Sequence, residues 1–267
     1  GGAALGAQPF AQCVGGFARA AVLAPHPPAG AREAAHALCE RLRAEGGAAE
    51  AIEADIAGAA GRAALMAAIA ADGGTLDCVV NNASAFEPDT GLDFEADAAL
   101  RQLGVNLIAP LDFARLLARQ AADSGIEGGD GADRSAIHVL DQKVYNLNPD
   151  YFSYTVSKLA LERAVALQAQ SLAPAVRVCG VAPGLMFESG PQDTENFRRA
   201  ARANLLRRPI DPADVARACV FLAGTPSATG TTLCVDNGQH LVPLARDIMF
   251  VVDELLHPDN EKKAPPP

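Results

Sequence analysis

The chain has 267 residues, 49% of them hydrophobic, and a formal net charge of -10. This length suits one large α/β domain or two small ones, and the apolar fraction is ample for a sizeable core. The acidic balance, with a pI near 4.9, argues against a nucleic-acid partner, which would need a basic stripe to neutralise phosphates. No apolar run reaches transmembrane length. The six cysteines form no C-x-x-C pair, so we expect no disulfide framework, no metal site, no membrane partner and a cytoplasmic, reducing location.

Short apolar runs alternate along the chain with longer Ala- and Leu-rich stretches of helical period. In the first half, this pattern predicts strands at residues 18–23, 51–55 and 76–80. Helices are predicted at 31–45 and 57–71, the second stopped by Gly73-Gly74. A long helix at 94–121 is predicted to be interrupted near Pro110.

In the second half, the same reasoning predicts strands at residues 135–140, 176–181 and 231–235, and helices at 151–172, 195–206 and 212–223. Strands that alternate with helices imply a doubly wound parallel sheet with helices on both faces, a Rossmann-like three-layer α/β/α fold. We expect one domain over residues 1–255 and a flexible tail at 256–267.

Polar and turn residues follow the predicted strands. They are Asp55, Asn81-Asn82, Asp141 and Pro183-Gly184. Because ligands of such sheets bind beyond the carboxyl ends of the strands, this edge is the expected functional site.

Tyr154 and Lys158 lie four residues apart on a predicted helix and therefore share a face. A neighbouring ammonium favours the phenolate and lowers the tyrosine pKa, which makes Tyr154 a candidate proton donor. The alternative is an accidental pair on a solvated helix face, which the scarcity of both residue types disfavours.

With these motifs in this order, residues 17–241 resemble the short-chain dehydrogenase/reductase family. Tyr154 to Lys158 matches its Y-x-x-x-K motif, and Asn81-Asn82-Ala83-Ser84 is similar to its N-N-A-G segment. The resemblance implies that Asn106 anchors a water in a proton relay, with a satisfied buried amide as the alternative. It also implies that Asp55 meets the adenine ring, with an ordinary turn residue as the alternative.

The resemblance further implies a nicotinamide dinucleotide, with NADPH expected and NAD as the alternative. Its expected binding residues are Gly2, Leu5, Gly6, Asp55, Ile56, Asn82, Ala83, Ser84, Tyr154, Lys158, Pro183, Gly184 and Leu185. After the second family strand, residues 24–28 offer neither an acid for a ribose 2′-hydroxyl nor an obvious arginine for a 2′-phosphate, although Arg32 lies nearby. The family's first strand and part of its glycine-rich loop are expected to be missing, because the sequence begins at Gly1-Gly2 inside that loop.

Asp141 occupies the place where most family members carry a serine, and in this it resembles the pteridine reductase branch, including dihydromonapterin-type reductases. Ser84 and Phe86 are similar to the residues that line the pterin site in that branch. The expected substrate-binding residues are Ser84, Phe86, Asp141 and Tyr154. The alternatives are that Asp141 caps a loop and that Phe86 packs in the core.

These observations predict an NADPH-dependent reductase of a pterin or similar conjugated heterocycle, with the catalytic residues Tyr154, Lys158, Asp141 and Asn106. A 3-oxoacyl or carbonyl reductase of the same family is one alternative, and a non-catalytic dinucleotide-binding or scaffold protein is another. Residues 185–203 are expected to form a mobile cover. The resemblance also implies a homo-oligomer, a dimer or tetramer, joined through the helices at 94–120 and 151–172.

Overall fold

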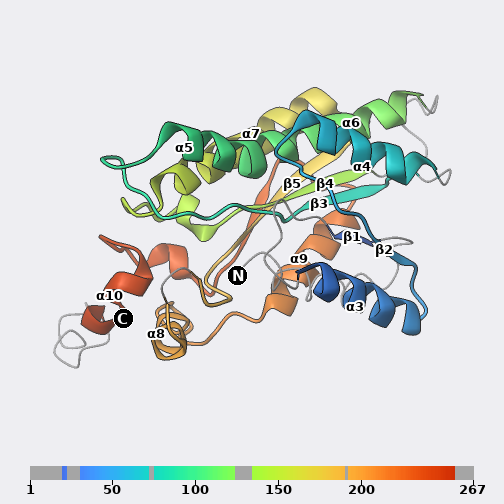
Figure 1. The fold of residues 1–267 in the computed structure, drawn as a ribbon. Coiled ribbons are helices and arrows are strands. Elements are labelled where there is room, and N and C mark those ends of the chain that lie inside the picture. Colours follow the sequence, from blue (N-terminus) through green and yellow to red (C-terminus); the bar gives the residue numbers. More distant parts are fainter. Residues whose placement is uncertain (1–19, 23–30, 72–74, 124–133, 190–191, 256–267) are drawn as a thin grey trace.

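The computed structural model describes residues 20–22, 31–71, 75–123, 134–189 and 192–255 (Figure 1). In this part of the chain all strand pairs are parallel, and they form two sheets. β1 (Ala20–Val22) pairs with β2 (Ala49–Ala51). The second sheet has the order β3-β4-β5-β6, with β3 at Cys78–Asn81, β4 at Ser135–Val139, β5 at Arg177–Pro183 and β6 at Thr232–Val235.

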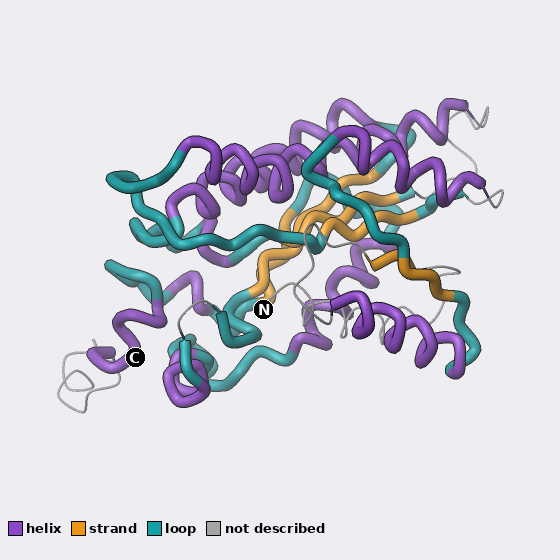
Figure 2. Tube along the Cα trace, in the orientation of Figure 1, coloured by secondary structure: helices purple, strands orange, loops and turns teal. Residues whose placement is uncertain are grey.

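Helices cover both faces of the four-stranded sheet (Figure 2). α6 (Ala109–Asp123) and α7 (Phe152–Leu172) lie on one face, where they enclose Ala136 of β4 and Val178 of β5. α9 (Pro212–Ala223) lies on the other face, against Ile137 and Val181. Successive strand residues therefore point into two different cores, which is why these strands are apolar throughout. The predicted three-layer parallel α/β fold is confirmed.

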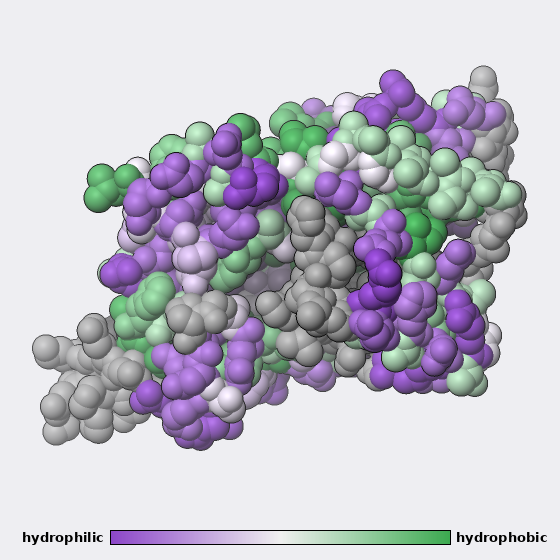
Figure 3. Space-filling model, in the orientation of Figure 1, coloured by the Kyte–Doolittle hydropathy of each residue, from purple (hydrophilic) through white to green (hydrophobic). Residues whose placement is uncertain are grey.

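Around this core lie α3 (Ala31–Ala44), α4 (Ala59–Ala71) and α5 (Ala96–Leu103). α3 buries Leu38 and Cys39 and exposes charged side chains to solvent (Figure 3). The buried Arg62 joins α4 to α6, because its Nε donates to Asp112 Oδ2 at 2.7 Å. Its Nη1 donates to the carbonyl of Ile56, also at 2.7 Å. These two contacts of Arg62 fix the loop that follows β2 against α6.

The predicted interruption near Pro110 is confirmed as a π-helical turn, η1 (Gly104–Ile108), between α5 and α6. Proline has no N–H, so Pro110 cannot give the carbonyl of Asn106 its α-helical hydrogen bond. The wider turn is the local solution, and such turns are frequent at functional sites. It places the buried Asn106 beside α7.

The C-terminal part departs from prediction at two helices. α8 (Thr194–Ala200) is shorter than the predicted helix at 195–206. The Nδ2 of Asn204 donates to the carbonyls of Ala201 and Arg208, both at 2.9 Å, and so stabilises a turn in place of further helix. α10 (Ile248–Leu255) was not predicted, although Asp247 precedes it as a cap and accepts a hydrogen bond from the backbone of Met249.

Two short 3-10 turns, η2 (Gln142–Val144) and η3 (Gln239–Leu241), complete the described elements. The helix stop at Gly73-Gly74, the tail at 256–267 and the expected cofactor residues Gly2, Leu5 and Gly6 lie outside the described residues. Within the described ranges, no helix has both the length and the apolar character needed to cross a bilayer.

A buried polar chain crosses the core between the sheet and α7. His138 of β4 is fully buried, and its two ring nitrogens lie 3.0 Å from Asn81 Nδ2 and 3.0 Å from Gln168 Oε1. The Nε2 of Gln168 donates to the carbonyl of Leu111 at 3.0 Å. Since Asn81 donates and Gln168 accepts, the network selects the neutral imidazole with its hydrogen on Nε2. Burial lowers the pKa of His138 to about 4.

This low pKa predicts an acid-sensitive core. The unfolded chain protonates His138 near its ordinary pKa of 6.5, whereas the folded chain does so only near 4, so stability is lost as pH falls between these values. Between about pH 7 and about pH 5, wild type should lose about 2 kcal/mol more unfolding free energy than His138→Gln. Urea denaturation at both pH values measures the difference, and equal losses in the two proteins would contradict the assignment.

Candidate active site

The carboxyl edge of the larger sheet gathers most of the predicted site residues. Asn82, Ala83 and Ser84 follow β3, Asp141 follows β4, and Gly184 and Leu185 follow Pro183 at the end of β5. The first turns of α7 bring Tyr154 and Lys158 to the same edge. Polar side chains from separate segments thus meet where a parallel sheet binds its ligands.

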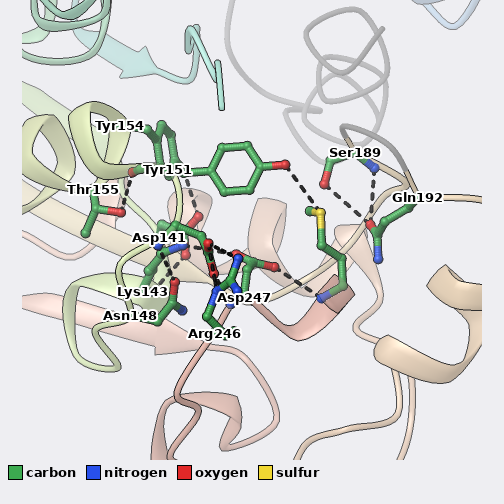
Figure 4. Close-up of polar contacts among 12 residues, drawn as sticks. Asp141, Lys143, Asn148, Tyr151, Tyr154, Thr155, Ser189, Gln192, Arg246 and Asp247 are labelled. Carbon is green, nitrogen blue, oxygen red and sulfur yellow. Dashed lines mark hydrogen bonds and ion pairs between the residues drawn. The ribbon is translucent and has the colours of Figure 1, made fainter. Parts of the chain in front are cut away.

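Tyr154 and Asp141 form a direct pair. The Tyr154 hydroxyl donates to Asp141 Oδ2, with 2.7 Å between the two oxygens, and both residues are drawn in Figure 4. Tyr154 is 6% exposed. The other carboxyl oxygen of Asp141 accepts the backbone N–H of Lys143 at 2.8 Å and so caps η2. Asp141 therefore caps a loop with one carboxyl oxygen, as in the alternative interpretation, and accepts the hydrogen bond from the Tyr154 hydroxyl with the other.

Burial governs the acidity of both partners. It raises the pKa of Asp141, although the hydrogen bonds from Lys143 and Tyr154 oppose the rise. Burial also raises the pKa of Tyr154 well above 10, and the charge of Asp141 raises it further. This direction is opposite to the one expected from Lys158, so that expectation is wrong in this structure. Burial thus shifts both pKa values in the direction that favours the protonated forms, which suits a pair that donates a proton.

The Lys158 ammonium lies against the ring of Tyr154 rather than at its hydroxyl. Its Nζ donates to the carbonyl of Val139 at 2.8 Å and lies 5.7 Å from the Tyr154 ring centroid. Burial lowers the pKa of Lys158 to about 8. Its two other N–H groups have no hydrogen-bond partner among the described residues. A buried ammonium with donors to spare suits a diol such as the ribose of a dinucleotide.

Asn106 uses its whole amide on protein partners. Its Oδ1 accepts from the Ala85 backbone at 2.7 Å and from Ser84 Oγ at 3.2 Å. Its Nδ2 donates to the Ala85 carbonyl at 2.8 Å and to Ser157 Oγ at 3.0 Å. No amide hydrogen is left for a relay water, so the side chain clamps the loop after β3 onto α7, as in the alternative of a satisfied buried amide.

Phe86 forms an aromatic wall with two tyrosines. Its ring stacks on Tyr151 with centroids 4.0 Å apart and planes at 14°. It meets Tyr154 edge-on at 4.7 Å. One face of Phe86 is therefore covered by Tyr151, and a flat substrate would have only the opposite face for stacking.

The remaining predicted cofactor residues lie in ordinary local structure. Asp55 is exposed, and its Oδ1 accepts the backbone N–H of Ala57 at 3.0 Å, as in a turn. The side chain of Ile56 is buried in the core under α4. Arg32 forms an ion pair with Glu53. A Cβ on Gly184 would lie 2.5 Å from Gln239 Oε1, so this glycine is required for packing.

Sequence reasoning missed three residues of this site, namely Lys143, Tyr151 and Asp247. The chain has only three tyrosines, and Tyr151 lies three positions before Tyr154. This spacing was the one sequence signal that could have indicated a role for Tyr151. Nothing in the sequence pointed to Asp247, because its partner Lys143 is 104 positions away.

The Asn106 clamp yields a prediction for stability. Asn106→Ala leaves both backbone groups of Ala85 and the hydroxyl of Ser157 without their partner, so the unfolding free energy should fall by about 2–4 kcal/mol. The matched control is Asn148→Ala, because Asn148 accepts one long hydrogen bond, 3.3 Å, from Asp150. Urea unfolding of both variants is the measurement, and equal small losses would show that the clamp contributes little.

The chain is similar to known oxidoreductases. Residues 29–240 match a protein-family model described as enoyl-(acyl carrier protein) reductase. An uncharacterized oxidoreductase of Mycobacterium tuberculosis is 32% identical over 208 residues, which cover 76% of this chain and 77% of that protein. Pteridine reductase 1 of Leishmania tarentolae is 33% identical over 193 residues, which cover 63% of this chain and 64% of that protein.

A solved structure gives the same assignment. FolM alternative dihydrofolate reductase 1 from Brucella suis, in complex with NADP, has a TM-score of 0.79 at 29% identity, covering 90% of this chain and 93% of that chain. The family model spans most of the chain, and the described fold and the Tyr154–Lys158 motif agree with it. The chain therefore belongs to the short-chain dehydrogenase/reductase family of NAD(P)-dependent oxidoreductases.

Proposed function

We propose that the protein is an NADPH-dependent reductase of a pterin or a similar conjugated heterocycle. The observation that carries the proposal is the buried Asp141–Tyr154 pair, 2.7 Å between Oδ2 and hydroxyl, with the aromatic ring of Phe86 edge-on to Tyr154. A carboxyl group offers a hydrogen-bonding partner to the N–H-rich edge of such a ring, and an aromatic face offers stacking.

The named relatives support this reading. Pteridine reductase 1 of Leishmania tarentolae and dihydromonapterin reductase of Citrobacter koseri are 33% and 28% identical to this chain over the matched residues. The Brucella suis protein crystallised with NADP, which favours NADPH for this chain also. Lys158, with two N–H groups unpartnered among the described residues, would hold the ribose.

The chemistry divides between cofactor and protein. When bound, NADPH supplies a hydride to an electrophilic ring carbon. The protein supplies the proton for the adjacent ring nitrogen from Tyr154 or Asp141, whose pKa values are both raised by burial. One hydride and one proton together saturate one C=N bond of the substrate.

The surroundings of the site complete the proposal. Residues 1–255 are proposed to form one domain. In its described C-terminal part, α8 and α10 pack together through Ala200, Ile248 and Val252. Residues 185–203 serve as the cover of the site. The enzyme works in the cytoplasm as a homo-oligomer, for which the exposed Leu100 of α5 and Leu167 of α7 are candidate contact residues.

The second candidate is a 3-oxoacyl or carbonyl reductase, which the description of the matching family model favours. Asp141 argues against it, because a carboxylate beside the phenol repels the oxyanion that forms as a ketone is reduced.

Substrate assays separate these functions. We expect oxidation of NADPH with dihydrobiopterin and no oxidation with an acetoacetyl thioester, followed by the cofactor's absorbance. Activity with the thioester alone would establish the second candidate. Cofactor binding without any turnover would indicate the non-catalytic alternative.

Two substitutions test the proton donor. Tyr154→Phe and Asp141→Asn should each lower kcat by about 100-fold or more, because general acid catalysis contributes factors of that order. Tyr145→Phe is the matched control, since the hydroxyl of Tyr145 donates to Glu162 at 3.1 Å, outside the Asp141–Tyr154 pair. Full activity in Tyr154→Phe would exclude that hydroxyl as the donor.

A further inference from the structure

The C-terminal segment is joined to η2 by a buried ion pair and to the loop before α7 by a second, partly exposed ion pair. Lys143 Nζ donates to Asp247 Oδ2 at 3.0 Å, and the side chains of this pair are 4% and 15% exposed. Arg246 binds both oxygens of Asp150, at 2.7 and 2.8 Å. The backbone N–H of Asp247 donates to Asp150 Oδ2 at 2.7 Å. Two regions that are distant in sequence are thus fixed together beside the proton-donating pair.

Lys143 connects this junction to Asp141. Its backbone N–H donates to Asp141 Oδ1 at 2.8 Å, while its ammonium reaches Asp247. The ammonium also lies 5.3 Å from the ring centroid of Tyr151. Since η2 is a single 3-10 turn, the ion pair at the far end of the Lys143 side chain limits how far the N–H that orients Asp141 can shift.

We propose that Lys143 and Asp247 form a positioning pair for the Asp141–Tyr154 proton donor. The C-terminal segment then contributes to proton transfer through Lys143, away from the reacting atoms. This inference rests on the proposed function, because that function makes Asp141 and Tyr154 the donors.

Lys143 and Asp247 have opposite effects on the acidity of the Asp141–Tyr154 pair. Asp141 is faced by Tyr154 and Lys158 from α7 and by Lys143 from η2. Burial raises the pKa of Asp141, and the Lys143 ammonium is among the groups that oppose the rise. Asp247 accepts from the Lys143 ammonium, and its backbone N–H donates to Asp150, which pairs with Arg246. The charge of Asp247 adds to the rise in the pKa of Tyr154 that burial and Asp141 cause. Because Lys143 and Asp247 carry opposite charges, we expect their removal to shift the pKa of Asp141 in opposite directions, which simple loosening of the fold would not do.

Titration of Asp141 is the direct test and needs no turnover. The carboxyl carbons of labelled aspartate are followed by NMR, and Asp141→Asn assigns the signal. Lys143→Met removes a positive charge, so the midpoint of Asp141 should move up. Asp247→Asn removes a negative charge and leaves Lys143 uncompensated, so the midpoint should move down. In the active enzyme, each variant should also lower kcat by about 10- to 100-fold with the KM for NADPH unchanged.

Arg62→Met is the matched control, because Arg62 and Asp112 form an ion pair of similar burial, 6% and 17% exposed. It should lower stability and leave both the Asp141 midpoint and kcat unchanged. Lys143→Arg keeps the cation and should restore both values toward wild type. If Lys143→Met does not fold, Lys143→Gln replaces it.

Unchanged midpoints, or shifts of the same sign in Lys143→Met and Asp247→Asn, would overturn the positioning pair. The absence of wild-type turnover with dihydrobiopterin would count against the proposed function alone. In that case the NMR midpoints still decide whether Lys143 and Asp247 position Asp141.

Discussion

The hydrogen bond from the Tyr154 hydroxyl to Asp141 joins two acidic groups whose pKa values are both raised by burial. Tyr154 belongs to α7, whereas Asp141 follows β4, so their 2.7 Å contact depends on how α7 packs against the sheet. Val165 and Ala169 of α7 enter the same core as Ala136 of β4. The apolar packing of helix on sheet therefore sets the geometry of the acid pair, and a shift in that packing would separate the two groups.

β4 supplies polar partners as well as apolar packing to α7. Its His138 binds Gln168 across the core, and its Val139 carbonyl accepts from Lys158. The charge of Lys158 helps to lower the pKa of His138, after the larger effect of burial. A neutral His138 beside a charged Lys158 avoids two adjacent buried cations. The strand thus keeps one positive charge at the site, close to the face of the Tyr154 ring.

Sequence periodicity predicted the layers and the Tyr154–Lys158 pair because both depend on local spacing. The helix at 212–223 was predicted at the bounds of α9. Spacing shows that Tyr154 and Lys158 share a helix face, but it does not show which atoms they meet. The structure directs Lys158 to the Val139 carbonyl and Tyr154 to Asp141, and this reverses the expected pKa shift of the tyrosine. α10 and its contacts with α8 and Lys143 depend on long-range packing, which no local pattern encodes.

Tyr151 links the local and the long-range parts of the site. It precedes α7 with φ 55° and ψ 52°, a left-handed backbone that costs about 1–2 kcal/mol for a residue with a side chain. Stacking on Phe86 and the hydrogen bond from its hydroxyl to Met249 Sδ, at 3.3 Å, oppose this cost. Met249 belongs to α10, which also packs on α8. A displacement of α8 would therefore move α10 and, through Met249, shift Tyr151. Because Tyr151 stacks on Phe86, the Phe86 ring that contacts Tyr154 would shift as well.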